Sequence, residues 1–72
     1  MPPVPAVPGA SVVKALQRHG FVIDRIQGSH HIMRHPDGRA TTVPVHHGKD
    51  LAKGTLRGIL RDVGMTVDQL GL

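Results

Sequence analysis

Three short β-prone segments, separated by turn signals, constrain the fold of this chain most. They are residues 21–26, which are rich in Phe, Val and Ile, and residues 30–35 and 40–46. Between them, Gln-Gly-Ser at 27–29 and Pro-Asp-Gly-Arg at 36–39 supply the Gly and Pro that tight turns use. Turns this short join antiparallel neighbours, so we expect a three-stranded antiparallel sheet. Pro44 cannot donate to a strand ladder, which favours an edge position or a bulge for the third strand.

A helix is predicted on each side of this β region. In residues 9–19 and 52–63 the apolar side chains recur at the spacing of one helical face. They are Val12, Val13, Ala15 and Leu16 in the first segment and Leu56, Ile59, Leu60 and Val63 in the second. Gly9 or Ser11 is placed to cap the first helix, and Gly20 and Gly64 are placed to end the two helices. Thr66 and Gln69 have the spacing of a capping box, which predicts one last helical turn.

This order predicts a small α+β fold with the arrangement α-β-β-β-α. Both apolar helix faces need the same sheet face to cover, so we expect a three-stranded antiparallel sheet covered on one face by two helices. The other sheet face is then open to solvent or to a ligand. The arrangement resembles a double-stranded-RNA-binding fold. We expect one domain at residues 9–72 and, because residues 1–8 contain four prolines, a flexible extended tail at residues 1–8.

A chain of 72 residues forms one domain with a small core. Phe21 is the only aromatic residue, so this core must be mainly aliphatic. The absence of cysteine excludes disulfides and thiolate metal sites and is consistent with a reducing compartment. No apolar run approaches the roughly 20 residues that cross a bilayer. We therefore expect a soluble, cytoplasmic protein that has no membrane partner.

The charge balance predicts a polyanionic partner. The chain has nine Lys and Arg residues and five acidic residues, all of them Asp, which gives a formal net charge of +4. Metal-dependent nucleases need clustered carboxylates, whereas these aspartates are scattered along the chain. Gly48-Lys49-Asp50 lacks the remaining residues of a phosphate-binding loop. We expect neither a resident metal nor a small-molecule cofactor.

Six histidines are the main chemical anomaly of the composition. His30 and His31 begin the second predicted strand, and His46 and His47 close the third, so these four can cluster at one end of the sheet. His35 lies beside the second turn and should be remote from them. Imidazole suits proton transfer near neutral pH, and RNA carries its own nucleophile, the 2′-OH. Clustered histidines can also bind Zn²⁺ or Ni²⁺, so a histidine-rich metal-binding protein remains an alternative.

Several basic residues are placed to contact a phosphate backbone. Lys53, Arg57 and Arg61 recur every four residues and so share one face of the second helix. Lys49 and Lys53 lie at or before the start of that helix, where an anion is favoured. A solvated helix face is the simpler interpretation of this spacing. Together with Arg25 and Arg34, these residues are the candidate contacts to nucleic acid.

The chain resembles the HicA-type mRNA interferase toxins. The resemblance begins with Gly28-Ser29-His30-His31-Ile32-Met33 and extends to Gly20-Phe21 before it. Further blocks follow in the family's order: His35-Pro36-Asp37-Gly38, Thr42 to His46, Gly48 to Leu51, and Gly54 to Leu60. It covers roughly residues 10–64. Met33 stands where an aromatic residue is common, and Gly58 replaces a better helix former.

The resemblance implies a toxin of a type II toxin–antitoxin system that cleaves mRNA. It implies that the histidine after Gly-Ser, here His30, is catalytic, and that a HicB-type antitoxin binds the toxin and blocks the site. We expect metal-independent cleavage, with Gly28 and Ser29 positioning His30. The expected RNA contacts are Gly28, Ser29, Arg34, Lys49, Lys53 and Arg57.

Strand alternation supplies a check on His30. In the second strand His30, Ile32 and Arg34 share one face, whereas His31, Met33 and His35 share the other. If Met33 packs in the core, His30 and Arg34 face the open side. The competing hypothesis is a non-catalytic double-stranded-RNA-binding module, which would bind RNA with salt-sensitive affinity and leave it intact.

Overall fold

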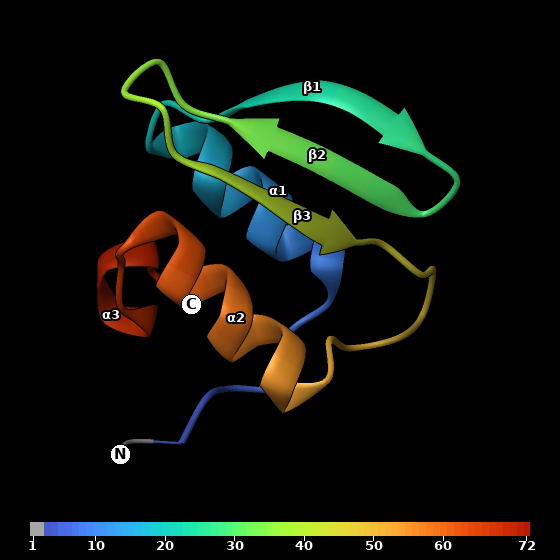
Figure 1. The fold of residues 1–72 in the computed structure, drawn as a ribbon. Coiled ribbons are helices and arrows are strands. Elements are labelled where there is room, and N and C mark those ends of the chain that lie inside the picture. Colours follow the sequence, from blue (N-terminus) through green and yellow to red (C-terminus); the bar gives the residue numbers. More distant parts are fainter. Residues whose placement is uncertain (1–2) are drawn as a thin grey trace.

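The computed structural model describes residues 3–72 and confirms the α-β-β-β-α arrangement (Figure 1). The elements are α1 (Gly9–Arg18), β1 (Val22–Gln27), β2 (His30–Arg34), β3 (Ala40–Pro44), α2 (Lys53–Val63) and α3 (Val67–Leu70). The short helix α3 is the predicted last turn. Its N-cap Thr66 accepts a hydrogen bond from the backbone of Gln69, whose side chain accepts one from the backbone of Thr66.

The three strands form one antiparallel sheet in the order β1-β2-β3. His30 lies opposite Gln27 on one side and Pro44 on the other, so these residues mark one end of the sheet. β3 is an edge strand, as Pro44 predicted. It ends at Pro44, two residues earlier than expected, although the backbone N–H of Val45 still donates to the carbonyl of Ser29 at 2.7 Å in the same register.

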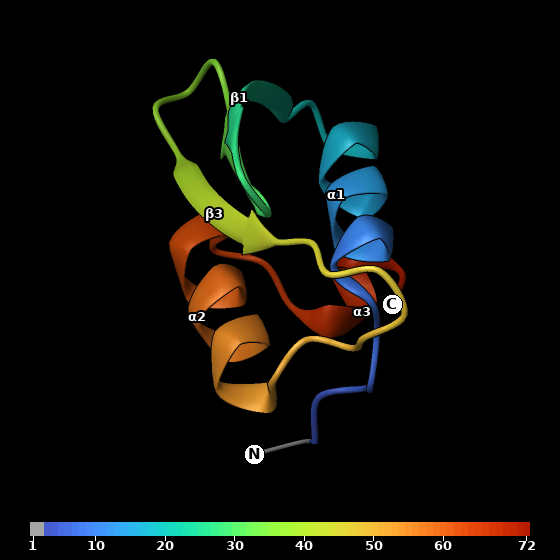
Figure 2. The ribbon, with the colours of Figure 1, turned by 90° about the vertical axis from the view of Figure 1, so that its right-hand side faces the viewer.

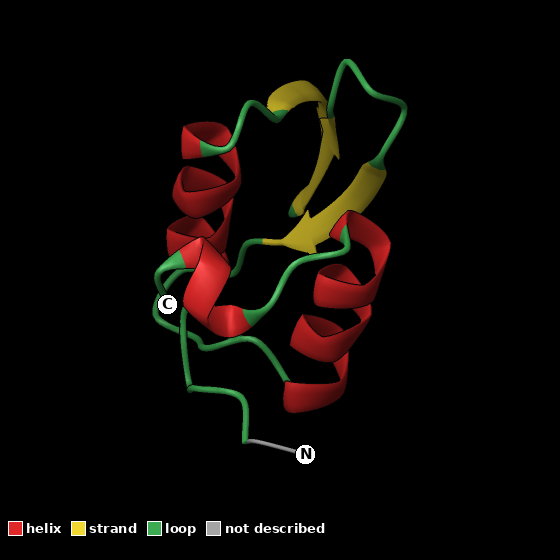
Figure 3. Ribbon diagram, turned by 90° about the vertical axis from the view of Figure 1, so that its left-hand side faces the viewer, coloured by secondary structure: helices red, strands yellow, loops and turns green. Residues whose placement is uncertain are grey.

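Both long helices pack against the same face of the sheet (Figures 2 and 3). The buried side chains of α1 and α2 meet Met33 and Val43 from the sheet. Met33 is fully buried and Phe21, just before β1, is 2% exposed. As predicted, a glycine with positive φ lies at the end of each helix: Gly64 directly follows α2, and Gly20 follows His19, the C-cap of α1. Neither helix begins with a side-chain cap. Pro8 and Ala52 occupy the N-cap positions, so the expected cap from Gly9 or Ser11 is not formed.

The N-terminal segment packs on the domain where a free tail was expected. Val4 is 8% exposed and belongs to the core cluster, and Val7 packs against it. The backbone N–H of Leu51 donates to the carbonyl of Val7 at 2.8 Å, and Pro8 bridges to Asp50. Prolines keep this segment extended, which lets its valines reach the helices. Residues 1–2 of the expected tail lie outside the described residues.

Gly58→Ala should raise the free energy of unfolding by about 0.5–1 kcal/mol, since glycine costs that much inside a helix. A Cβ at Gly58 meets no atom within 4 Å. Gly64→Ala is the matched control: its Cβ also meets nothing, but its φ of 66° is a left-handed conformation that alanine adopts poorly. That variant should be less stable than wild type. Chemical denaturation measures both, and a stabilised Gly64→Ala would contradict this account.

The turn between β2 and β3 is held by a carboxylate. Asp37 accepts hydrogen bonds from the side chain of Arg39 at 2.8 Å and from its backbone N–H at 3.0 Å. The Arg39 side chain first, and its backbone N–H second, lower the pKa of Asp37 from 3.8 to about 2. The unfolded chain therefore takes up this proton at a higher pH than the folded one.

The contribution of Asp37 to stability should be complete above about pH 4 and lost as the pH falls toward 2. Asp37→Asn removes this titration. In urea unfolding, the stability difference between wild type and this variant should shrink over that pH interval. A difference that stays constant from pH 5 to 2 would show that the carboxylate does not titrate in this way.

Candidate functional site

His30 stands on the open face of the sheet. Because Met33 is buried beneath the helices, the alternation along β2 places His30 and Arg34 on the opposite face, and both side chains are exposed. This confirms the prediction that His30 and Arg34 face the open side if Met33 packs in the core. Arg34 forms an exposed ion pair with Asp24 at 3.1 Å. The open face therefore carries an imidazole and, four residues further along the strand, a guanidinium.

The turn before His30 is short and firmly attached. Gln27 and His30 pair directly, so Gly28 and Ser29 form a two-residue hairpin loop. Gly28 has φ 57°, and glycine at the first position is the mark of a type II′ turn. The carbonyl of Ser29 accepts the backbone N–H of Val45 at 2.7 Å. This bond fixes the turn, and with it the start of β2, against the chain that leaves β3.

Two further histidines contact the same turn. Nε2 of His46 lies 3.5 Å from the Ser29 hydroxyl, and Nδ1 of His31 lies 3.3 Å from the Ser29 carbonyl oxygen. His35 lies at the other end of β2, where its ring meets Phe21 edge-on at 4.9 Å between centroids and its Nδ1 lies 3.0 Å from Asp37. The structure thus brings His30, His31 and His46 to one end of the sheet and leaves His35 at the other.

This histidine cluster does not provide a metal site. Among residues 3–72, no three His or Asp side chains converge in a way that could hold a metal ion. His31 faces the helix-covered side of the sheet together with Met33, whereas His30 faces the open side. The alternation of the strand therefore separates the two adjacent imidazoles.

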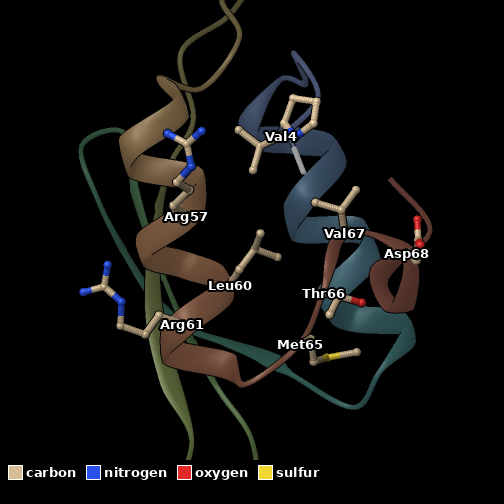
Figure 4. Close-up of a pocket in the computed structure, with 9 residues that line it drawn as sticks. Val4, Arg57, Leu60, Arg61, Met65, Thr66, Val67 and Asp68 are labelled. Atoms are coloured by element: carbon tan, nitrogen blue, oxygen red, sulfur yellow. The ribbon is translucent and has the colours of Figure 1, made fainter. Parts of the chain in front are cut away.

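The candidate basic contacts fall into two groups. Lys49 lies in the same loop as His46, since its backbone N–H donates to the His46 carbonyl at 3.1 Å, and Lys53 begins α2 soon after. Both side chains are exposed. Arg57 instead lines a pocket of about 530 Å³ together with Arg61, and none of the strand residues lines it (Figure 4). The remaining lining residues come from α2, the α2–α3 region and the N-terminus: Pro3, Val4, Leu60, Met65, Thr66, Val67 and Asp68.

The contact between Ser29 and His46 adds a detail that the sequence did not predict, namely which clustered histidines contact the Gly28–Ser29 turn. The sequence grouped four histidines at this end of the sheet, and in the structure His46 contacts the hydroxyl of Ser29 whereas His31 contacts its carbonyl oxygen. The sequence feature that indicates this contact is the position of His46, two residues after Pro44. Pro44 pairs with His30, so His46 lies near the turn that precedes His30. The pocket beside Arg57 had no such signal, because it depends on the packing of the N-terminal segment.

A family model described as the HicA toxin of bacterial toxin–antitoxin systems matches residues 9–65. The chain belongs to the HicA toxin family. A comparison with curated proteins gives no match. The match covers α1, the whole sheet and α2, and so includes the Gly28–Ser29 turn and His30.

As a HicA toxin, the protein has a cognate antitoxin as its partner. The HicA domain forms the complete sheet and both long helices, whereas Val4 and α3 pack onto it from outside the matched residues. No helix in residues 3–72 has the length and apolar character that crossing a membrane requires.

Proposed function

We propose that this HicA toxin is a metal-independent mRNA endoribonuclease in which His30 performs general acid–base catalysis. The observation that carries the proposal is the exposed imidazole of His30 on the open face, beside a turn that is bonded to the chain after β3. An RNA strand has access to this face because no helix of residues 3–72 covers it (Figure 2). We place the protein in the cytoplasm, where mRNA is present.

The chemistry uses the nucleophile of the RNA itself. The 2′ oxygen attacks the adjacent phosphorus as it loses its proton, the bond from phosphorus to the 5′ oxygen breaks, and that oxygen takes up a proton. His30 serves as the base for the first proton or the acid for the second. The products are a 2′,3′-cyclic phosphate and a 5′-hydroxyl. This route needs no ligand set for a metal, and none converges among residues 3–72.

Cationic side chains near the phosphate would stabilise its developing charge. Arg34 shares the open face with His30, and its ion pair with Asp24 is exposed and therefore weak enough to exchange for a phosphate. Gly28 and Ser29 bring the backbone of the turn next to the imidazole. We propose that Lys49 and Lys53 contact the RNA beyond the cleaved bond. Arg57 would contact only an RNA strand that continues around α2.

The antitoxin partner is proposed to be of the HicB type and to act by covering the open face at His30. Exposure of this face in the free toxin supports the proposal, because an inhibitor must reach the same surface as the RNA. Bound antitoxin should suppress cleavage and should compete with RNA for the toxin.

RNA cleavage by the purified chain should be the same in EDTA as in Mg²⁺, because His30 needs no metal to move a proton. The measurement is the initial rate on a single-stranded RNA that carries one labelled end. Cleavage that disappears with EDTA and returns with Mg²⁺ would contradict the metal-independent route. RNA that is bound but left intact in both buffers would favour the non-catalytic double-stranded-RNA-binding module instead.

A further inference from the structure

β1 is an edge strand whose outer side has no partner among residues 3–72. All six of its residues are exposed. The large exposed hydrophobic side chains of the described chain all lie on it: Val22 is 58% exposed, Ile23 37% and Ile26 54%. Figure 1 shows β1 at the margin of the sheet, with β2 separating it from β3. An exposed apolar edge of this kind is a template for pairing with another strand.

A β-bulge gives β1 an unusual pattern of faces. Ile23 lies opposite Met33 and Ile26 opposite His31, so both isoleucines face the helix-covered side, although they are three residues apart. The bulge between Ile23 and Arg25 makes this possible, because it adds one residue, Asp24. A regular strand would place residues three apart on opposite faces.

The other four residues of β1 face the open side. Val22, Arg25 and Gln27 lie opposite Arg34, Ile32 and His30, which belong to that face. Asp24 contacts Arg34 and therefore points to it as well. From 22 to 27 the faces are thus open, covered, open, open, covered, open. This order reads the same in both directions and is centred between Asp24 and Arg25.

We propose that β1 pairs antiparallel with β1 of a second copy of this chain. A two-fold axis between Asp24 and Arg25 places Ile23 opposite Ile26 of the second copy, twice, on the covered side. It places Asp24 opposite Arg25 of the second copy, also twice, on the open side. Aliphatic pairs and opposite charges directly across an antiparallel ladder are both stabilising.

The charges favour a second copy over an unrelated strand. A lone charge in an edge strand discourages pairing, but an adjacent Asp and Arg are complementary to their own reversed sequence. The ion pair with Arg34 uses Oδ2 of Asp24, which leaves Oδ1 for a second guanidinium. Arg25 forms no ion pair within residues 3–72. Both halves of the proposed contact are therefore available.

The dimer would be a six-stranded sheet in which both open faces lie on one side, because the axis is perpendicular to the sheet. Each copy contributes one strand of six residues, fewer than the roughly 20–30 residues of a standard interface. We therefore expect weak association that becomes visible at high protein concentration. The proposal does not depend on the catalytic role of His30.

Charge exchange across the axis tests this register. Sedimentation equilibrium of the wild-type chain, from micromolar to millimolar concentration, should show monomers passing into dimers. Asp24→Arg alone and Arg25→Asp alone should each weaken self-association by at least about tenfold, because each brings like charges together. A one-to-one mixture of the two variants should dimerise again, since every cross-axis pair in it is opposite in charge. The exposed Lys14→Asp on α1 is the control and should dimerise like wild type.

Circular dichroism establishes that each variant is folded before it is compared. Wild type that stays monomeric throughout this range would overturn the proposal. If β1 amides in that monomer are protected from hydrogen exchange only when antitoxin is bound, β1 contacts the antitoxin and not a second copy. Dimers that form equally well in both single variants would also overturn it, because they would use another surface. If the one-to-one mixture of the two variants did not dimerise, the proposed register would be wrong.

Discussion

His30→Ala should lower the rate of RNA cleavage by at least about 10²–10⁴-fold, the usual contribution of one positioned general acid or base. The variant should fold normally, because the imidazole is exposed and lies outside the buried core. Single-turnover cleavage of an end-labelled RNA measures the effect directly. Binding of the same RNA with 2′-O-methyl groups, which cannot react, should change only a few-fold.

Two other histidines serve as controls for His30. His19 is exposed at the C-cap of α1 and makes no contact with the Gly28–Ser29 turn, so His19→Ala should cleave like wild type. His46→Ala removes the contact with the Ser29 hydroxyl and should cause a smaller loss than His30→Ala. Equal cleavage by wild type and His30→Ala would remove His30 from the mechanism.

Local sequence signals were sufficient to predict the order of elements and the orientation of β2. Gly28-Ser29 and the turn after His35 fix which strands are neighbours, because only adjacent antiparallel strands can be joined so tightly. Alternation along β2 then left one question, whether Met33 or Ile32 faces the helices. Burial of Met33 settled it and placed His30 on the open face.

Features that depend on contacts between distant segments were not predictable. Val4 and Val7 lie in a proline-rich stretch that has no helical or strand period, and their packing depends on core residues that are distant in the sequence. The same packing turns the side of α2 that carries Arg57 into a pocket wall, away from the sheet. The bulge at Asp24 likewise has no signature in residues 21–26, because it is a relation between β1 and β2.

Phe21→Ala should be strongly destabilising, with a loss of about 3–5 kcal/mol. Phe21 is the only aromatic residue and is 2% exposed. Its ring meets His35 edge-on, and the guanidinium of Arg39 lies 5.2 Å from the ring centroid. A chain of 72 residues has a total stability of only about 4–11 kcal/mol. The loss therefore removes a large part of it, and the melting temperature should fall by at least about 12 °C.

The control substitutions separate the aromatic contacts of Phe21 from its volume. Phe21→Leu keeps an apolar group in the core but loses the ring contacts with His35 and Arg39, so its loss should be clearly smaller than that of Phe21→Ala. Val22→Ala changes the next residue, which is 58% exposed, and should alter stability by no more than about 0.5 kcal/mol. Arg39 also donates to the carbonyl of Val63 at the end of α2, so the ring supports a side chain that links the turn after β2 to that helix. If Phe21→Ala were no more destabilising than Val22→Ala, the core would not be organised around this ring.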